Sequence, residues 1–262
     1  MNNRQYDEEA NWTTDGTAVP VCKILNVKIA AINMNWIIKF LEKNLKALSG
    51  DYICVANVHT TVMAYEDAEY LGIQNGGIMA IPDGGPLSYI GRKRGFERME
   101  RVTGPDLMSH IFELSEKNKY RHFFYGSTEE TLKEMNRNIK KEFPNLQIVG
   151  MYSPPFRLLT EDENQKMIDM INDLEPDFIW VGLGAPKQEK WMAEHKNKVK
   201  GLMIGVGAGF DYFAGNIKRA PKWMQNHNLE WLYRLIQDPR RLFHRYFYTN
   251  SKFLFNVIIK KK

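Results

Sequence analysis

Short apolar runs rich in β-branched and aromatic residues alternate with longer amphipathic runs from residue 21 to about residue 217, and this alternation is the strongest constraint on the fold. It is typical of repeated strand–helix units that build one mostly parallel sheet. We therefore predict an α/β fold. Six runs are predicted to be strands: 52–58, 77–83, 121–126, 146–152, 177–184 and 201–210.

Two segments between the predicted strands have apolar side chains at spacings of three and four, as in an amphipathic helix. In the first, the residues with this spacing are Leu132, Met135, Ile139 and Phe143. Its start is predicted at Ser127, which is followed by acidic residues. The second segment spans 160–174 and starts at Thr160, again with acidic residues behind it. Both segments are predicted to be capped helices.

Composition limits the class of protein and its compartment. Apolar residues make up 44% of the chain and charged residues 26%, which excludes a mainly disordered chain. The two cysteines, Cys22 and Cys54, are too few for a disulfide framework or a structural zinc site, and this favours a reducing, cytoplasmic compartment. No run approaches the roughly 18–20 apolar residues of a membrane-spanning helix, and the polar start lacks the plan of a signal peptide. We expect neither secretion by that route nor an integral membrane protein.

Charge is distributed unevenly along the chain. Residues 218–262 contain 11 Lys and Arg against Glu230 and Asp238, a net charge of +9, whereas the whole chain carries +5. Residues 1–217 therefore carry −4. An acidic body with a basic end indicates an anionic partner, either a lipid surface or a nucleic acid. We predict three parts: a flexible N-terminal arm (1–20), a body (21–217) and a basic aromatic C-terminal appendage (218–262).

The appendage is predicted to be helical, with a second helix that begins at Pro239. Arg234, Arg241 and Arg245 are expected on one face of these helices. One apolar stripe is expected on another face, formed by Leu232, Leu235, Ile236, Leu242, Phe243, Tyr246 and Phe247. Two interpretations stay open. The helices pack on the core with their cations in water, or their aromatic side chains enter a bilayer while the cations pair with anionic headgroups.

Polar residues follow the first two predicted strands, and ligands of open parallel sheets bind beyond the carboxyl ends of the strands. Asn57 lies at the end of the first strand, and Thr60 and Thr61 follow it; helix capping explains one such residue, but not several. Asp83 ends the second strand, and Gly84 follows it. Asp-Gly is a common turn signal, but a carboxylate at this edge is also placed to act as a general base. Asp83 is the best-placed single candidate for that role.

Three further positions are candidates for binding an anion. Arg101 lies just before a Thr-Gly-Pro loop, where a guanidinium suits a phosphate, although most single arginines are only surface residues. After the fifth predicted strand, Gly184 and a proline precede Lys187 and Gln188 at the expected start of a helix. This arrangement exposes backbone N–H groups near the positive end of the helix dipole.

The third position follows the last predicted strand, where Gly207 and Asp211 belong to a glycine-rich run. Asp211 is either a second carboxylate of the same pocket or the cap of the next turn.

Several cofactor motifs are absent from the sequence. Lys187 replaces the third glycine of the dinucleotide fingerprint, and there is no P-loop, DxD pair, HExxH or GxSxG motif. A reaction without a metal, assisted by arginine, glutamine and backbone donors, is therefore favoured. A nicotinamide-dependent oxidoreductase and a non-enzymatic nucleic-acid-binding protein are kept as alternatives, because a parallel sheet does not fix the function.

Taken in order, the motifs resemble those of one family over residues 21 to about 250. They are ANVHTTV, IPDGGPL, RVTGPDL, FYGS, VGLGAPKQE, GVGAGFDYFAG and RAPKWMQNHNLEWLYRLIQDPRR. This series resembles the WecG/TagA/CpsF family of bacterial glycosyltransferases. The resemblance implies a Rossmann-like catalytic domain with helices on both faces of the sheet and a C-terminal appendage that places the enzyme on the membrane.

The resemblance also implies roles for individual residues. Asp83 matches the proposed base, Asn57 the polar residue at a strand end, and Arg101 the arginine before the Thr-Gly pair. Further matches are expected to bind substrate: Thr60, Thr61, Gly84, Gly184, Lys187, Gln188, Gly207, Asp211, Arg234, Arg240, Arg241 and Arg245. The four arginines of the appendage are implied partners of a lipid diphosphate.

The implied reaction is the metal-independent, inverting transfer of a hexose or N-acetylhexosamine, such as N-acetylmannosamine or glucose. The donor is a UDP-sugar, no other cofactor is expected, and the acceptor is a sugar linked to undecaprenyl diphosphate. The products serve capsule, exopolysaccharide or wall teichoic acid synthesis. The expected location is peripheral, on the cytoplasmic face of the membrane at an anionic surface. No nucleic-acid partner is expected, and self-association stays open.

Overall fold

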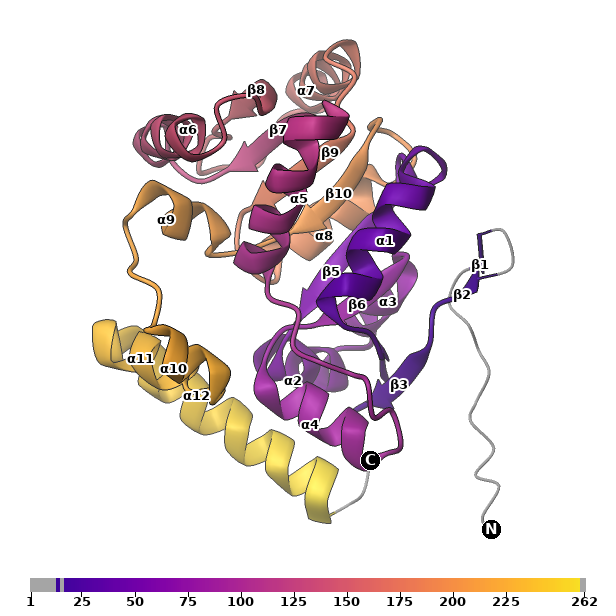
Figure 1. Cartoon of the computed structure of the whole chain (residues 1–262), viewed down its shortest axis with the longest axis vertical. Helices are drawn as coiled ribbons and strands as arrows, with labels where there is room; N and C mark the ends of the chain where they lie inside the picture. Colours follow the sequence, from indigo (N-terminus) through magenta and orange to yellow (C-terminus); the bar gives the residue numbers. More distant parts are fainter. Residues whose placement is uncertain (1–12, 15–16, 260–262) are drawn as a thin grey trace.

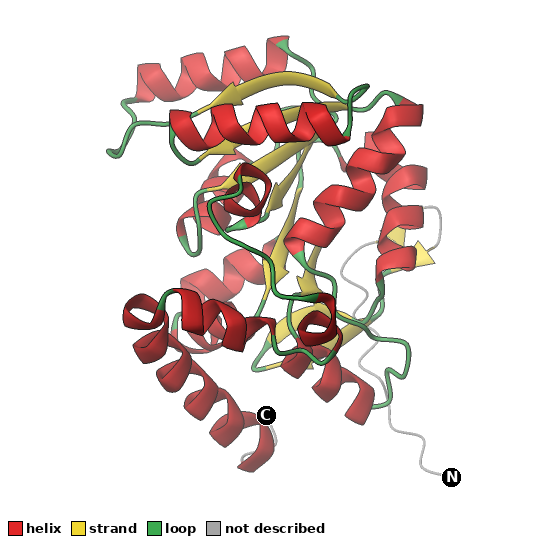
Figure 2. Ribbon diagram, turned by 60° about the vertical axis from the view of Figure 1, so that its left-hand side comes forward, coloured by secondary structure: helices red, strands yellow, loops and turns green. Residues whose placement is uncertain are grey.

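Eight strands form one sheet in the order β3-β4-β6-β5-β10-β9-β7-β8 (Figures 1 and 2). The structure is a computed structural model and describes residues 13–14 and 17–259. The strands are β3 (Val21–Ile24), β4 (Val27–Ala30), β5 (Tyr52–Ala56), β6 (Met79–Pro82), β7 (Arg121–Gly126), β8 (Gln147–Tyr152), β9 (Phe178–Gly182) and β10 (Leu202–Gly205). β3 and β4 pair antiparallel, and all other neighbours pair parallel. The predicted α/β fold with a mostly parallel sheet is confirmed.

All six predicted strands are present, although several are shorter than predicted. The largest difference is at β10, which ends at Gly205 because the glycine-rich run behind it forms a turn and then the start of the next helix. The hairpin of β3 and β4 at the sheet edge was not among the predicted strands. Every residue of β5 is buried, as expected for a central strand that is covered on both faces.

Helices lie on both faces of the sheet, as expected (Figure 2). One face is covered by α1 (Met34–Asn44), α5 (Gly104–Asn118), α6 (Glu129–Glu142) and α9 (Gly209–Ala214). The other face is covered by α2 (Val58–Glu66), α3 (Ala68–Gly76), α4 (Gly85–Lys93), α7 (Glu161–Asp173) and α8 (Lys187–His195). A 3-10 turn, Leu45–Leu48, follows α1. Side chains of β5 alternate between the two cores, since Ile53 and Val55 belong to one and Cys54 to the other.

Both helices predicted from their periodicity are present. α7 has the predicted cap, in which the side chain of Thr160 accepts from the Glu163 backbone and the Glu163 side chain accepts from the Thr160 backbone. α6 is capped by Thr128 and not by Ser127. Ser127 has a positive φ of 62°, outside the extended region that a capping residue adopts.

The chain order places the carboxyl ends of four strands around one crevice. β5 lies between β6, which follows it in the sequence, and β10, which comes much later. Connections from β5 and β10 therefore leave toward opposite sides, and such a switch point opens a crevice outside the sheet. The segments after β5, β6, β9 and β10 all meet at this edge.

The appendage consists of α10 (Lys222–Asn226), α11 (Glu230–Gln237) and α12 (Pro239–Leu254), which continues as a π-helix over Phe255–Ile259. α12 begins at Pro239 as predicted and packs along α2 (Figure 1). The predicted single apolar stripe is wrong. Leu242 and Phe253 are both buried, whereas the side chains of Phe243 and Phe247 lie on the outer face and are 62% and 68% exposed.

The arm predicted over 1–20 lies mostly outside the described residues, apart from an antiparallel pairing of Thr13–Thr14 with Thr17–Ala18. Among the helices that the structure describes, none has the length and apolar character needed to cross a bilayer.

Candidate active site

A cavity of about 640 Å³ lies at the carboxyl edge of the sheet, between the body and the appendage. The loops after β5, β6, β9 and β10 form one side, and residues of α11 and α12 form the other. Eleven of the predicted site residues line it: Asn57, Thr60, Asp83, Gly84, Arg101, Gly184, Gln188, Gly207, Asp211, Arg234 and Arg245. The sheet topology thus brings together residues that are up to 188 positions apart in the sequence.

Asp83 lies directly after β6 and is held by its backbone, whose N–H donates to Ala56 O at 2.7 Å. Gly84 follows with φ +123°, a conformation that side chains rarely adopt, so the chain turns sharply behind the carboxylate. Burial raises the pKa of Asp83 to about 6. Within the described residues, no donor forms a hydrogen bond to this carboxylate. A carboxylate in such a state can accept a proton from a bound hydroxyl near neutral pH.

Asn57 and Thr60 form a capping box at the start of α2. Asn57 Oδ1 accepts from the Thr60 N–H at 3.1 Å, and Thr60 Oγ1 accepts from the Asn57 N–H at 2.9 Å. Both residues border the cavity, but these oxygens are used by the helix start. Thr61 is fully buried, donates to Asn57 O at 2.7 Å and lies outside the cavity. Its predicted place in a binding site is therefore not supported by the geometry.

Gln188 borders the cavity but is only 4% exposed, and its amide is engaged on both sides. Its Oε1 accepts from the Gly207 N–H at 3.0 Å, and its Nε2 donates to Glu189 at 2.7 Å. Gln188 therefore ties the start of α8 to the loop after β10. Lys187 is exposed and is not among the residues that line the cavity, so its binding role stays a prediction.

Asp211 lies in the first turn of α9, where its side chain accepts from Asn216 at 3.2 Å and its backbone oxygen accepts from the Asn216 N–H. It borders the cavity, whereas the N-cap of α9 is Ala208 and no side chain of the described residues caps this helix. The ring of the next residue, Tyr212, lies close to two guanidinium groups. The Cζ atoms of Arg219 and Arg234 are 5.5 and 5.9 Å from its ring centroid.

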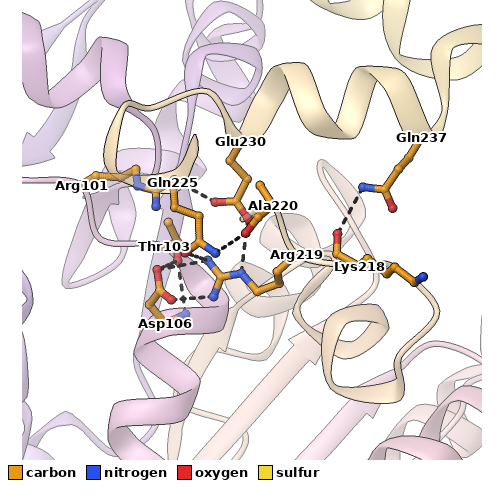
Figure 3. A network of polar contacts seen from close by, with 9 residues as sticks. All are labelled: Arg101, Thr103, Asp106, Lys218, Arg219, Ala220, Gln225, Glu230 and Gln237. Carbon is orange, nitrogen blue, oxygen red and sulfur yellow. Dashed lines mark hydrogen bonds and ion pairs between the residues drawn. The ribbon is translucent and has the colours of Figure 1, made fainter. Parts of the chain in front are cut away.

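The arginines around the cavity fall into two groups. Arg101 and Arg219 form ion pairs with Glu230, and Arg219 also pairs with Asp106 (Figure 3). Arg234 and Arg245 form no ion pair with any carboxylate in the part of the chain that the structure describes. Both face the cavity from the appendage, which makes them the available cations for an anionic ligand. Arg240 is exposed and outside the cavity, and the Arg241 side chain lies outside the described residues.

At the end of the cavity between α2 and α12, His59 and Arg245 lie close together. Burial and the charge of Arg245 lower the pKa of His59 to about 4, so its imidazole is neutral at pH 7. His59 Nδ1 and Arg245 Nε are buried and have no hydrogen-bond partner within the described residues. Unpaired buried polar atoms are costly, so this end of the cavity is suited to a polar ligand.

The profile of the glycosyl transferase WecG/TagA/CpsF family matches residues 22–262, which is almost the entire chain. The chain belongs to the WecG/TagA/CpsF family. It is therefore a glycosyltransferase, and the resemblance found in the ordered motifs is confirmed. The oxidoreductase and nucleic-acid-binding alternatives receive no support.

Curated relatives of this WecG/TagA/CpsF member are N-acetylglucosaminyldiphosphoundecaprenol N-acetyl-beta-D-mannosaminyltransferases. The protein of Bacillus subtilis (strain 168) is 32% identical over 83% of this chain and 84% of its own length. That of Bacillus spizizenii (strain W23) is 29% identical over 77% and 76%, and that of Staphylococcus aureus (strain MW2) is 28% identical over 73% and 74%. The match spans most of each protein, so the comparison concerns whole enzymes.

Of the cavity residues that were not predicted from the sequence, four take part in the contacts described above: His59, Tyr212, Arg219 and Glu230. His59 lies between the predicted site residues Asn57 and Thr60, and Tyr212 directly follows Asp211. Their proximity in sequence to predicted residues could therefore have indicated both. Glu230 is one of two acidic residues in a strongly basic segment, which is itself unusual.

Among the described residues, no group of three or more His, Cys, Asp or Glu is arranged to hold a metal ion.

Proposed function

We propose that this glycosyltransferase transfers N-acetylmannosamine from its UDP derivative to N-acetylglucosaminyl-diphosphoundecaprenol, with inversion and without a metal ion. The choice of sugars rests on the names of the relatives from Bacillus and Staphylococcus. The product belongs to the synthesis of wall teichoic acid or a similar surface polymer. The observation that carries the proposal is a single cavity bordered by the unpaired carboxylate of Asp83 and by two unpaired guanidinium groups, Arg234 and Arg245.

The proposed step uses these groups in a single displacement. The oxygen of the acceptor hydroxyl bonds to the anomeric carbon as the bond from that carbon to the diphosphate oxygen breaks, and UDP leaves with the electron pair. Asp83 takes the hydroxyl proton. Arg234 and Arg245 supply positive charge for the diphosphate groups, a role that metal ions have in other transferases. One displacement inverts the anomeric configuration.

The outer face of the appendage supports a peripheral position on the cytoplasmic face of the membrane. Two exposed aromatic side chains of α12, Phe243 and Phe247, lie on it. Phe243 and Phe247 stack with ring centroids 6.2 Å apart. An apolar helix face flanked by basic residues is typical of segments that lie in the bilayer interface. Residues of the same helix line the cavity, so a lipid-linked acceptor held at the bilayer would lie close to it.

An assay with defined substrates tests the proposed reaction. The purified protein, UDP-N-acetylmannosamine and N-acetylglucosaminyl-diphosphoundecaprenol should yield a lipid-linked disaccharide that mass spectrometry detects. UDP-N-acetylglucosamine and UDP-glucose serve as control donors, and they should give little product. The rate should be unchanged in EDTA, since arginines carry the charge. A strict need for Mg²⁺ or Mn²⁺, or a preference for another donor, would contradict the corresponding part of the proposal.

Flotation with phosphatidylglycerol vesicles tests the membrane surface. The double variant Phe243→Ser/Phe247→Ser should bind vesicles more than about tenfold more weakly, because each buried phenyl ring contributes about 1.5–3 kcal/mol. Deletion of residues 218–262 should also weaken binding. The matched control is Phe156→Ser/Leu158→Ser, which removes two side chains that are 95% and 93% exposed on a loop of the body. Equal loss in both double variants would contradict a specific role for α12.

A further inference from the structure

Glu230 links the appendage to the body through two guanidinium groups. Its Oε2 accepts from Arg101 Nη1 at 2.9 Å, and its Oε1 accepts from Arg219 Nε at 3.3 Å (Figure 3). The Glu230 side chain is 12% exposed and that of Arg101 17%, so water screens this pair only weakly. Arg219 is held further by Asp106, and its Nη2 donates to Gln225 at 3.3 Å. The pairs thus form one continuous network.

The same network surrounds Asp83. The charged and titratable groups that influence its carboxylate are Arg101 on the loop before α5, Asp106 on α5, Tyr212 on α9, and Glu230 and Arg234 on α11. Arg101 is the strongest of the opposing charges, yet its guanidinium forms its ion pair with Glu230 and not with Asp83. The ion pair of this guanidinium is thus with another carboxylate, and Asp83 has no paired cation among the described residues.

We propose that Glu230 is a positioning residue, which holds the Arg101 guanidinium in an ion pair away from Asp83 and so leaves the Asp83 carboxylate free to accept a proton from the substrate. This inference rests on the proposed function, in which Asp83 is the base. The structural part of the inference, that Glu230 determines which carboxylate Arg101 contacts, does not depend on the proposed function.

The physical reason is competition between two carboxylates for one guanidinium. Charge-assisted pairs of arginine and carboxylate are strong and favour defined geometry, so Arg101 binds the better-placed partner. If the charge of Glu230 is removed, Asp83 and Asp106 are the carboxylates on which the charge of Arg101 still acts, and only Asp83 lacks an ion pair of its own. An ion pair with arginine lowers the pKa of an aspartate by about 1–3 units and occupies its oxygens. Asp83 would then be a weaker and less accessible base.

The test is Glu230→Gln, which keeps the shape of the side chain and removes its charge. In this variant kcat should fall about tenfold or more, and the acid limb of the kcat/KM profile should move at least one pH unit below the wild-type midpoint near 6. The pKa of Asp83 is measured directly from the ¹³C shift of its carboxyl group, assigned with Asp83→Asn. This second readout needs no turnover.

Two comparisons separate positioning from a general structural or electrostatic effect. Asp106→Asn is the matched control: it weakens the hold on Arg219 at the same contact with the appendage but leaves the Arg101 pair intact, so it should shift the Asp83 pKa much less. In an Arg101→Gln background, Glu230→Gln should shift the Asp83 pKa clearly less than in the wild-type background, because only the direct repulsion between Glu230 and Asp83 is then lost. An equal shift with or without Arg101, or an unchanged Asp83 pKa in Glu230→Gln, would overturn the proposal. A shifted pKa with unchanged turnover would keep the positioning and refute Asp83 as the base.

Discussion

Asp83→Asn should lower kcat by about 10²–10⁴-fold, the usual contribution of a positioned general base. Asparagine has nearly the same shape but cannot take the proton of the acceptor hydroxyl. The binding of UDP, measured by calorimetry, should stay within a few-fold of wild type, because the substitution changes no group assigned to the diphosphate. Glycosyl transfer is measured under single-turnover conditions, so that product release does not hide the chemical step.

The pH dependence of the wild-type enzyme follows from the direction of the Asp83 shift. Only the ionised carboxylate is a base, so kcat/KM should rise with pH through about 6 and stay high above it. Asp83→Asn should lose this limb. Because burial raises the pKa of Asp83, the charged form costs folding free energy above pH 6, so the variant should unfold at no lower temperature than wild type at pH 8. Near-normal turnover in the Asp83→Asn variant would show that Asp83 is not the base.

The location of the site could be predicted because strand ends are readable from the sequence. Asp83 is predictable because it ends a short apolar run, and in the structure β6 ends one residue before it. The same rule predicts Asn57 and Gln188, which come after β5 and β9. These choices need only the rule that parallel strands present their carboxyl ends at one edge.

Side-chain partners could not be predicted in this way. Arg101 and Glu230 are 129 positions apart, and no local pattern links them. Lys187 and Thr61 stand in the predicted motifs, but one residue along a helix turns a side chain by about 100°, so Lys187 faces solvent and Thr61 faces the backbone. The face of α12 that packs inward was also not predictable, because both of its faces carry apolar residues and only α2 decides which is buried.

Arg234→Gln should weaken the binding of UDP by about 10- to 150-fold. Hydrogen bonds to charged groups contribute about 1.5–3 kcal/mol, and each 1.36 kcal/mol corresponds to a factor of ten. Arg234 is suited to this role because its guanidinium borders the cavity, lies 5.9 Å from the centroid of the Tyr212 ring and has no carboxylate partner among the described residues. Its charge is therefore not already neutralised, unlike that of Arg219.

The matched control is Arg240→Gln, which removes the same charge from the same appendage at an exposed position outside the cavity. A general effect of positive charge on an anionic nucleotide would weaken UDP binding equally in both variants and would fall with salt. A contact with the diphosphate would affect only Arg234→Gln and would largely persist at 0.5 M salt, because a pair inside the cavity is screened weakly. Equal dissociation constants for Arg234→Gln and wild type would show that the donor diphosphate lies elsewhere, and Arg245 would then be the cation to examine.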